Sequence, residues 1–158
     1  MIVTVQVLFV CLGNICRSPM AEAVFRHLVN EAGLSDKITI DSAGTGSWHV
    51  GESAHRGTLA VLREHGIEHH GRARQISPQD FDQYDYILAM DSDNLADLRR
   101  MMPPNTKAEI RRFLEYAADV PVRDVPDPYY EGNFEAVYEL VRRGAEGLLA
   151  HIRQEKGL

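Results

Sequence analysis

The run VTVQVLFV at residues 3–10 limits what this chain can fold into more than any other segment. It is almost continuously apolar and rich in β-branched residues, which is typical of a strand buried on both faces of a parallel sheet. The run is too short to cross a bilayer as a helix, and it lacks the basic region that begins a signal peptide. The pattern therefore predicts a buried strand over Val3–Val10.

Strands and helices alternate along the rest of the chain. Apolar residues at helical spacing predict a helix that starts at Ser18-Pro19 and stops at Gly33. Further strands are predicted within 37–45, 84–91 and 107–116, and helices over 54–66 and 92–102. We also expect a short helix that is capped by Ser77 and starts at Pro78, and a last helix that is capped by the side chain of Asn133. Residues 117–133 are expected to form a long loop. The alternation predicts one α/β domain over residues 1–158, with helices on both faces of a parallel sheet.

The composition narrows the partners and the location of the protein. The formal net charge is −6, and no basic stretch stands out, so we expect neither nucleic acid nor a membrane as a partner. The two cysteines, Cys11 and Cys16, are too few and too close together for the disulfide framework of a secreted protein. We therefore expect a reducing, cytoplasmic setting.

Ligands of parallel sheets bind at the carboxyl ends of the strands. Cys11, the Gly44–Gly51 loop and Asp91 lie at the ends of three of the predicted strands. We therefore expect these three segments to meet at one edge of the sheet, where a binding site would form.

The segment CLGNICRS at residues 11–18, the cysteine loop, joins the first strand to the first helix. Backbone N–H groups and a helix start make such a loop a cradle for an anion, and Gly13 permits the tight path. Positive potential favours the thiolate of Cys11, and Arg17 offers a fork for two phosphate oxygens. A nucleotide-binding loop is disfavoured, because the glycine-lysine signature is absent. The segment therefore predicts a nucleophile and a phosphate clamp together.

Three segments resemble the low-molecular-weight protein tyrosine phosphatases: CLGNICRSPMAEAVF, DSAGTGSWHVGESAHRGT and VPDPYYEG. The resemblance spans essentially the whole chain. It implies a flavodoxin-like three-layer α/β/α sandwich with a central four-stranded parallel sheet. It also implies hydrolysis of phosphotyrosine and aryl phosphates through a phosphocysteine, with no metal and no cofactor.

The resemblance also implies roles for single residues. Cys11 would be the nucleophile, and Arg17 would bind phosphate together with the loop residues Leu12, Gly13, Asn14, Ile15, Cys16 and Ser18. Asp127 would be the general acid. Without the resemblance, its position before Pro128 would indicate only an aspartate in a turn. Asp124 is the alternative acid, but it lacks the match to the family's Asp-Pro pair.

Further residues would shape and support the site. Trp48 would form one wall of the substrate cleft and Tyr129 and Tyr130 the other, the alternative being that they pack over the sheet edge. The resemblance gives Asn14, Ser18 and Ser42 a supporting role for the loop. The resemblance also implies that Cys16 can form a reversible disulfide with Cys11. Without the resemblance, Cys16 is equally consistent with a small side chain that packs in the core.

The spacing of the histidines does not predict a metal site. His65, His69 and His70 lie close in sequence, but Gly66 interrupts the helix that would align the first two, and no cysteine joins them. The expected ligands are instead a phosphotyrosine-containing protein or a small aryl phosphate, with inorganic phosphate or another oxyanion able to occupy the loop.

Three other functions compete with tyrosine phosphatase. Protein-arginine phosphatases of the same family carry Thr where this chain has Ile15, whose larger apolar side chain favours a phenyl ring. Arsenate reductases share the fold but need further cysteines, and this chain has none after Cys16. A phosphotyrosine-binding or redox-sensing protein without turnover would lack the nucleophile or the acid, and both Cys11 and Asp127 are present.

Overall fold

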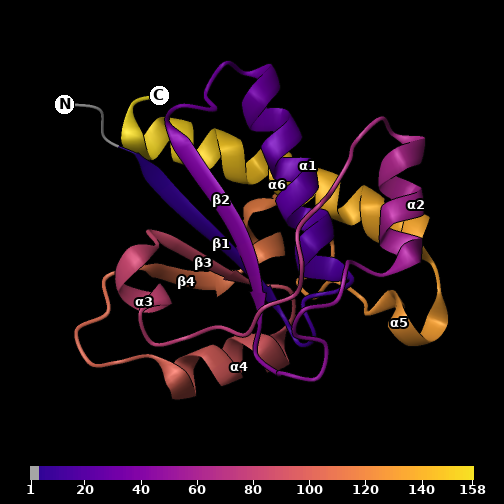
Figure 1. The fold of residues 1–158 in the computed structure, drawn as a ribbon. Helices are drawn as coiled ribbons and strands as arrows, with labels where there is room; N and C mark the ends of the chain where they lie inside the picture. The colour runs from indigo at the N-terminus through magenta and orange to yellow at the C-terminus, as the bar shows by residue number, and fades with distance from the viewer. Residues whose placement is uncertain (1–3) are drawn as a thin grey trace.

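The computed structural model describes residues 4–158, which form a four-stranded, fully parallel sheet (Figure 1). The order of the strands across the sheet is β2-β1-β3-β4. This flavodoxin-like order confirms the expected fold class. The first strand starts two residues later than expected, and Val3 lies outside the described residues. The strands are β1 (Val5–Cys11), β2 (Ile38–Gly44), β3 (Tyr86–Ala89) and β4 (Glu109–Arg112).

Helices cover both faces of the sheet (Figure 1). One face packs against α1 (Arg17–Glu31), α2 (Arg56–Glu64) and α6 (Phe134–Lys156), and the other against α3 (Asp80–Gln83) and α4 (Ser92–Met101). The short helix α5 (Pro128–Glu131) precedes α6, and a 3₁₀ helix, η1 (Phe113–Tyr116), follows β4. Among residues 4–158, no helix has the length and apolar character to cross a membrane.

The central strand β1 divides its side chains between the two halves of the core. Val7 and Phe9 pack on the side of α1 and α6, whereas Leu8 and Val10 pack on the side of α3 and α4. This alternation is the period of two that a strand imposes, and it explains why the run is apolar throughout. The same period places Cys11, the last residue of β1, on the side of α1.

Three expectations about the helices were wrong in detail. Helix α3 begins at Asp80, because the Asp80 carboxylate accepts a hydrogen bond from the Ser77 N–H at 2.7 Å and closes a turn there instead. Asn133 does precede α6, but its φ of 57° is left-handed and its side chain makes no capping hydrogen bond. The expected loop 117–133 contains α5, which is too short to show a helical period.

Gly147 in α6 provides a test of how closely this helix packs on η1. A Cβ at this position would overlap the Tyr116 carbonyl oxygen, which is backbone and does not rotate away. We expect Gly147→Ala to lower the free energy of unfolding in urea by about 1–3 kcal/mol. Helix propensity alone would instead favour Ala over Gly by about 1 kcal/mol.

The matched control is Ala150→Gly, at an exposed position of the same helix. It should cost about 1 kcal/mol, as helix propensity requires. A Gly147→Ala chain that is as stable as the unchanged protein, or more stable, would contradict the packing described here.

Candidate active site

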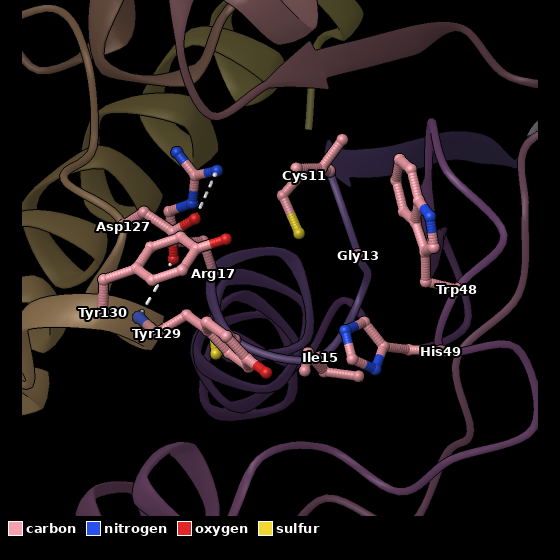
Figure 2. A pocket seen from close by; sticks show the side chains of 11 residues that line it. Cys11, Gly13, Ile15, Arg17, Trp48, His49, Asp127, Tyr129 and Tyr130 are labelled. Atoms are coloured by element: carbon pink, nitrogen blue, oxygen red, sulfur yellow. Dashed lines mark hydrogen bonds and ion pairs between the residues drawn. The ribbon is translucent and has the colours of Figure 1, made fainter.

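The cysteine loop wraps around the sulfur of Cys11 at the carboxyl end of β1. Cys11 Sγ accepts a hydrogen bond from the Asn14 N–H at 3.2 Å and lies 3.0 Å from Ser18 Oγ. Helix α1 begins at Arg17, so its positive end adjoins the same sulfur. In Figure 2 the sulfur points into the open cleft. The loop N–H groups and the helix end favour the binding of an anion beside the sulfur.

Asn14 holds the loop in this shape. Its φ of 57° is left-handed, and its side-chain amide donates to Ser18 Oγ at 2.8 Å and to Ser42 Oγ at 2.9 Å. Its carbonyl oxygen accepts from the Arg74 N–H at 3.0 Å. Because Ser18 Oγ accepts from Asn14, its own proton is free to point at the Cys11 sulfur. The three residues expected to support the loop therefore lie in one hydrogen-bonded chain.

A buried carboxylate continues this chain away from the loop. Ser42 Oγ donates to Glu22 Oε1 at 2.5 Å, and Arg26 donates to Glu22 Oε2 at 2.8 Å. Burial alone would raise the pKa of Glu22, but hydrogen bonds from His69, Ser42 and Arg26 lower it below its ordinary value. Glu22 is therefore a charged anchor for Ser42.

The loop also needs room on the side of β2. Gly44 ends this strand, and a Cβ there would lie 2.7 Å from the Leu12 carbonyl oxygen. The N–H groups of Thr45 and Gly46 donate to the carbonyl oxygens of Cys11 and Leu12 at 2.9 Å each. The Gly44–Gly51 loop therefore meets the cysteine loop at the sheet edge, as the strand pattern predicted.

Cys16 lies in the same cleft but in a different electrostatic setting. It is buried and precedes α1, and its thiol is free. Burial, and then the neighbouring Cys11 and Asp127, raise the pKa of Cys16 to about 12. Cys16 therefore remains a neutral thiol near pH 7.

The guanidinium of Arg17 is buried between two carboxylates. Its Nη1 donates to Asp91 Oδ2 at 2.6 Å and to the Val125 carbonyl oxygen at 2.9 Å, and its Nη2 lies 3.6 Å from Asp127 Oδ2. Burial opposes the charge of Arg17, but Cys11 and Asp91 more than offset this and raise the pKa of Arg17 above its ordinary value. The charge that would clamp a phosphate is therefore held in place before any ligand arrives.

Asp127, rather than Asp124, lies in the cleft (Figure 2). Its Oδ1 accepts from the Tyr129 N–H at 3.0 Å at the start of α5, and its Oδ2 faces Arg17. Asp124 accepts instead from the N–H and hydroxyl of Ser92, at 3.1 and 2.9 Å. Of the two aspartates considered as the acid, Asp127, which the resemblance favoured, lines the cleft, and Asp124 does not line it.

Aromatic side chains from two segments face each other across the cleft (Figure 2). Trp48 and His49 come from the Gly44–Gly51 loop, and Tyr129 and Tyr130 come from α5. Trp48 is 72% exposed and Tyr130 is 81% exposed, so these rings are not part of the core. The cleft between them has a volume of about 370 Å³ and ends at the cysteine loop.

The three histidines considered as metal ligands each face a different carboxylate rather than one another. His65 faces Glu135, His69 faces Glu22 and His70 faces Glu68, at 2.9, 3.4 and 3.2 Å. Each is thus paired with a different carboxylate.

The sequence did not predict the part that two residues, Asp91 and His49, have in the site. Asp91 was placed at the right sheet edge, but its contact with Arg17 was not predicted. The available signal was its position directly after a buried strand. There Asp91 caps α4 by accepting a hydrogen bond from the Asn94 N–H at 2.7 Å. His49 lines the cleft beside Trp48, and only its place in the same loop pointed to it.

The fold and the site define a class: a parallel α/β protein with a thiol in an amide-lined loop beside a buried arginine, as in cysteine-dependent phosphatases. A family model described as low molecular weight phosphotyrosine protein phosphatase matches residues 6–158. The chain belongs to this family of enzymes.

Relatives support this membership over most of the chain. The low molecular weight protein-tyrosine-phosphatase YfkJ of Bacillus subtilis is 54% identical over 155 residues, which are 98% of this chain and 99% of that protein. Its crystal structure matches with a TM-score of 0.93 over 97% of both chains. A low molecular weight phosphotyrosine protein phosphatase of Schizosaccharomyces pombe is 53% identical over 82% of this chain and 83% of its own.

The crystal structure of a drosophila arginine phosphatase is also similar. It matches with a TM-score of 0.88 and 38% identity, over 93% of this chain and 97% of that one. Similarity of fold therefore does not separate the two substrate classes.

The different settings of the two cysteines predict selective alkylation. Because burial raises the pKa of Cys16 to about 12, we expect iodoacetamide at about pH 7 to modify Cys11, whose sulfur points into the cleft, and to leave Cys16 intact. Peptide mass spectrometry would locate the adduct, and inorganic phosphate should slow its formation by filling the loop. Equal labelling of both cysteines in the folded protein would contradict the setting assigned to Cys16.

Proposed function

We propose that this protein hydrolyses phosphotyrosine in proteins, and small aryl phosphates, through a phosphocysteine intermediate. The observation that carries the proposal is the position of Cys11 Sγ, which has donors at 3.0 and 3.2 Å and shares the cleft with Arg17 and Asp127. A nucleophile, a phosphate clamp and a proton donor within one cleft are what phosphoryl transfer from a phenol requires. Family membership supports the same activity.

In the first step Cys11 Sγ attacks phosphorus, and the bond from phosphorus to the phenolic oxygen breaks. The loop N–H groups from Leu12 to Ser18 and the Arg17 guanidinium hold the three equatorial oxygens and stabilise their charge. Asp127 donates a proton to the departing oxygen, which leaves as a neutral phenol.

In the second step the same carboxylate acts in the opposite direction. Asp127 removes a proton from a water molecule that attacks phosphorus, the sulfur–phosphorus bond breaks, and inorganic phosphate leaves. Phosphate or another oxyanion is then expected to occupy the loop and to compete with substrate.

The aromatic walls suit a phenyl ring. Trp48 stands on one side and Tyr129 and Tyr130 on the other, so a flat ring passes between apolar faces on its way to Cys11 (Figure 2). Ile15, 6% exposed, adds an apolar surface beside the loop. These aromatic and apolar surfaces favour a phenyl group over a charged guanidinium, which loses more hydration on entering them. Protein-arginine phosphatase remains the second candidate, since a similar solved structure has that title.

We also propose that the active site responds to oxidants. Hydrogen peroxide would take two electrons and the two thiol protons from Cys11 and Cys16, which gives a disulfide and two water molecules. Two equivalents of a thiol would reduce the disulfide and be oxidised to their own disulfide. Both cysteines are free and line the same cleft. A reducing cytoplasm, which we propose as the location, would keep the enzyme active.

A pair of aspartate variants tests the role of Asp127. We expect Asp127→Asn to lower kcat on a phosphotyrosine peptide by roughly 10²–10⁴-fold, because the phenol then departs without a proton. The loss in kcat/KM, which reports the first step alone, should be smaller for p-nitrophenyl phosphate, whose leaving group needs no proton. Asp124→Asn is the matched control and should change kcat little. Equal losses in the two variants would contradict the assignment.

A comparison of two peptides tests the substrate. In EDTA and a reductant, we expect phosphate release from a phosphotyrosine peptide to far exceed release from a phosphoarginine peptide. Cys11→Ser should abolish both. Ile15→Thr should shift the preference toward phosphoarginine by roughly tenfold, because it shrinks the apolar surface beside the loop. Preferential turnover of phosphoarginine by the unchanged protein would keep the cysteine mechanism and overturn the substrate.

A further inference from the structure

A second cluster of chemically able side chains lies at the opposite end of the sheet. Glu109 is the first residue of β4, and His151 and Glu155 lie four residues apart on the last turns of α6, so both face β4. Glu109 pairs in the sheet with Tyr86, which pairs with Val7, four residues before Cys11 on β1. The cluster is therefore separate from the cleft.

The ligand atoms of these three residues lie within 4.8 Å of one another. His151 Nε2 is 3.4 Å from Glu109 Oε2 and 3.3 Å from Glu155 Oε2. These distances exceed the usual hydrogen-bond length, and Nε2 is buried without a hydrogen-bond partner. The nitrogen therefore points between two carboxylate oxygens without satisfying either.

The two distances from His151 Nε2 match the edges of a tetrahedral metal site, and the two carboxylate oxygens lie within 4.8 Å of each other. When an ion binds nitrogen and oxygen at 2.0–2.1 Å, adjacent ligand atoms of the tetrahedron lie about 3.3–3.4 Å apart. Both distances from His151 Nε2 have this value. We propose that Glu109, His151 and Glu155 bind one divalent transition-metal ion, with Zn²⁺ as the ion that fits best.

Two tyrosines orient the proposed ligands. The Tyr86 hydroxyl donates to Glu155 Oε1, which leaves Oε2 facing His151. The Tyr116 hydroxyl donates to Glu109 Oε2, the oxygen that also faces His151, and this oxygen keeps a second lone pair for an ion. The rings of Tyr116 and Tyr86 also meet the His151 imidazole edge-on, with centroids 4.9 and 6.1 Å away. Hydrogen bonds of this kind around the ligands are a regular part of metal sites and fix the direction of their lone pairs.

The donor set selects the ion. One imidazole and two carboxylates suit Zn²⁺, with a water molecule as fourth ligand, whereas Mg²⁺ and Ca²⁺ prefer oxygen alone.

Two basic groups face the same carboxylates: Arg111 Nε lies 3.8 Å from Glu109 Oε2, and Lys156 Nζ lies 4.0 Å from Glu155 Oε1. Both are partly exposed and can move into solvent when the ion arrives. A bound ion would fasten the end of α6 to β4 and stabilise the folded chain.

Titration with Zn²⁺ tests the site in a Cys11→Ser, Cys16→Ser chain, which removes the thiols that would otherwise bind zinc. We expect calorimetry to give one Zn²⁺ per chain, and the melting temperature to rise with Zn²⁺ concentration. Co²⁺ in place of Zn²⁺ should give the absorption of a tetrahedral complex. No saturable binding to this chain would overturn the proposal.

Variants in the same background locate the ion. His151→Gln and Glu155→Gln should each abolish stoichiometric binding, and the second keeps a partner for Tyr86 if the first fails to fold. Tyr86→Phe should weaken binding roughly 10–100-fold.

His27→Gln is the matched control. His27 lies 3.4 Å from Glu31 at the same helical spacing, and within residues 4–158 no third ligand group joins this pair. The variant should leave binding unchanged. Undiminished binding in both His151→Gln and Glu155→Gln would also overturn the proposal.

Discussion

The hydrogen bonds of Asn14 are the interactions on which the site depends. This one side chain joins the cysteine loop to Ser42 on β2 and to the backbone at Arg74, and it keeps its own residue in a left-handed conformation. That conformation turns the Asn14 N–H toward the Cys11 sulfur. A loop free to relax would not keep this donor on the sulfur, so loop rigidity and the electrostatics of the thiol have the same origin.

Arg17 joins the remaining segments at the same edge of the sheet. It lies at the start of α1, yet it contacts Asp91 at the start of α4 and Asp127 at the start of α5. A parallel sheet makes this possible, because the carboxyl ends of neighbouring strands open on one side. A buried arginine with two acidic neighbours holds a fixed geometry and remains charged. The fold thus supplies a phosphate clamp whose parts come from distant positions in the sequence.

Much of this could be predicted from the sequence, where the pattern is local. The buried strand, the sheet edge and the cysteine loop follow from apolar runs and from residues a few positions apart. Asp127 was different, since an Asp-Pro pair in a loop is equally typical of a turn, and only resemblance singled it out. The contact of Asp91 with Arg17 and the approach of Glu109 to His151 escaped prediction, because the partners lie far apart in sequence. Helix α5 escaped because a single turn shows no pattern.

The central claim is that Cys11 carries the phosphoryl group, and trapping the intermediate tests it most directly. An Asp127→Asn chain mixed with p-nitrophenyl phosphate should form the intermediate readily and hydrolyse it slowly, because the base for water is missing. Rapid denaturation followed by peptide mass spectrometry should then find one phosphoryl group on Cys11. Turnover without any phosphorylated Cys11, or a phosphoryl group on another residue, would contradict the account.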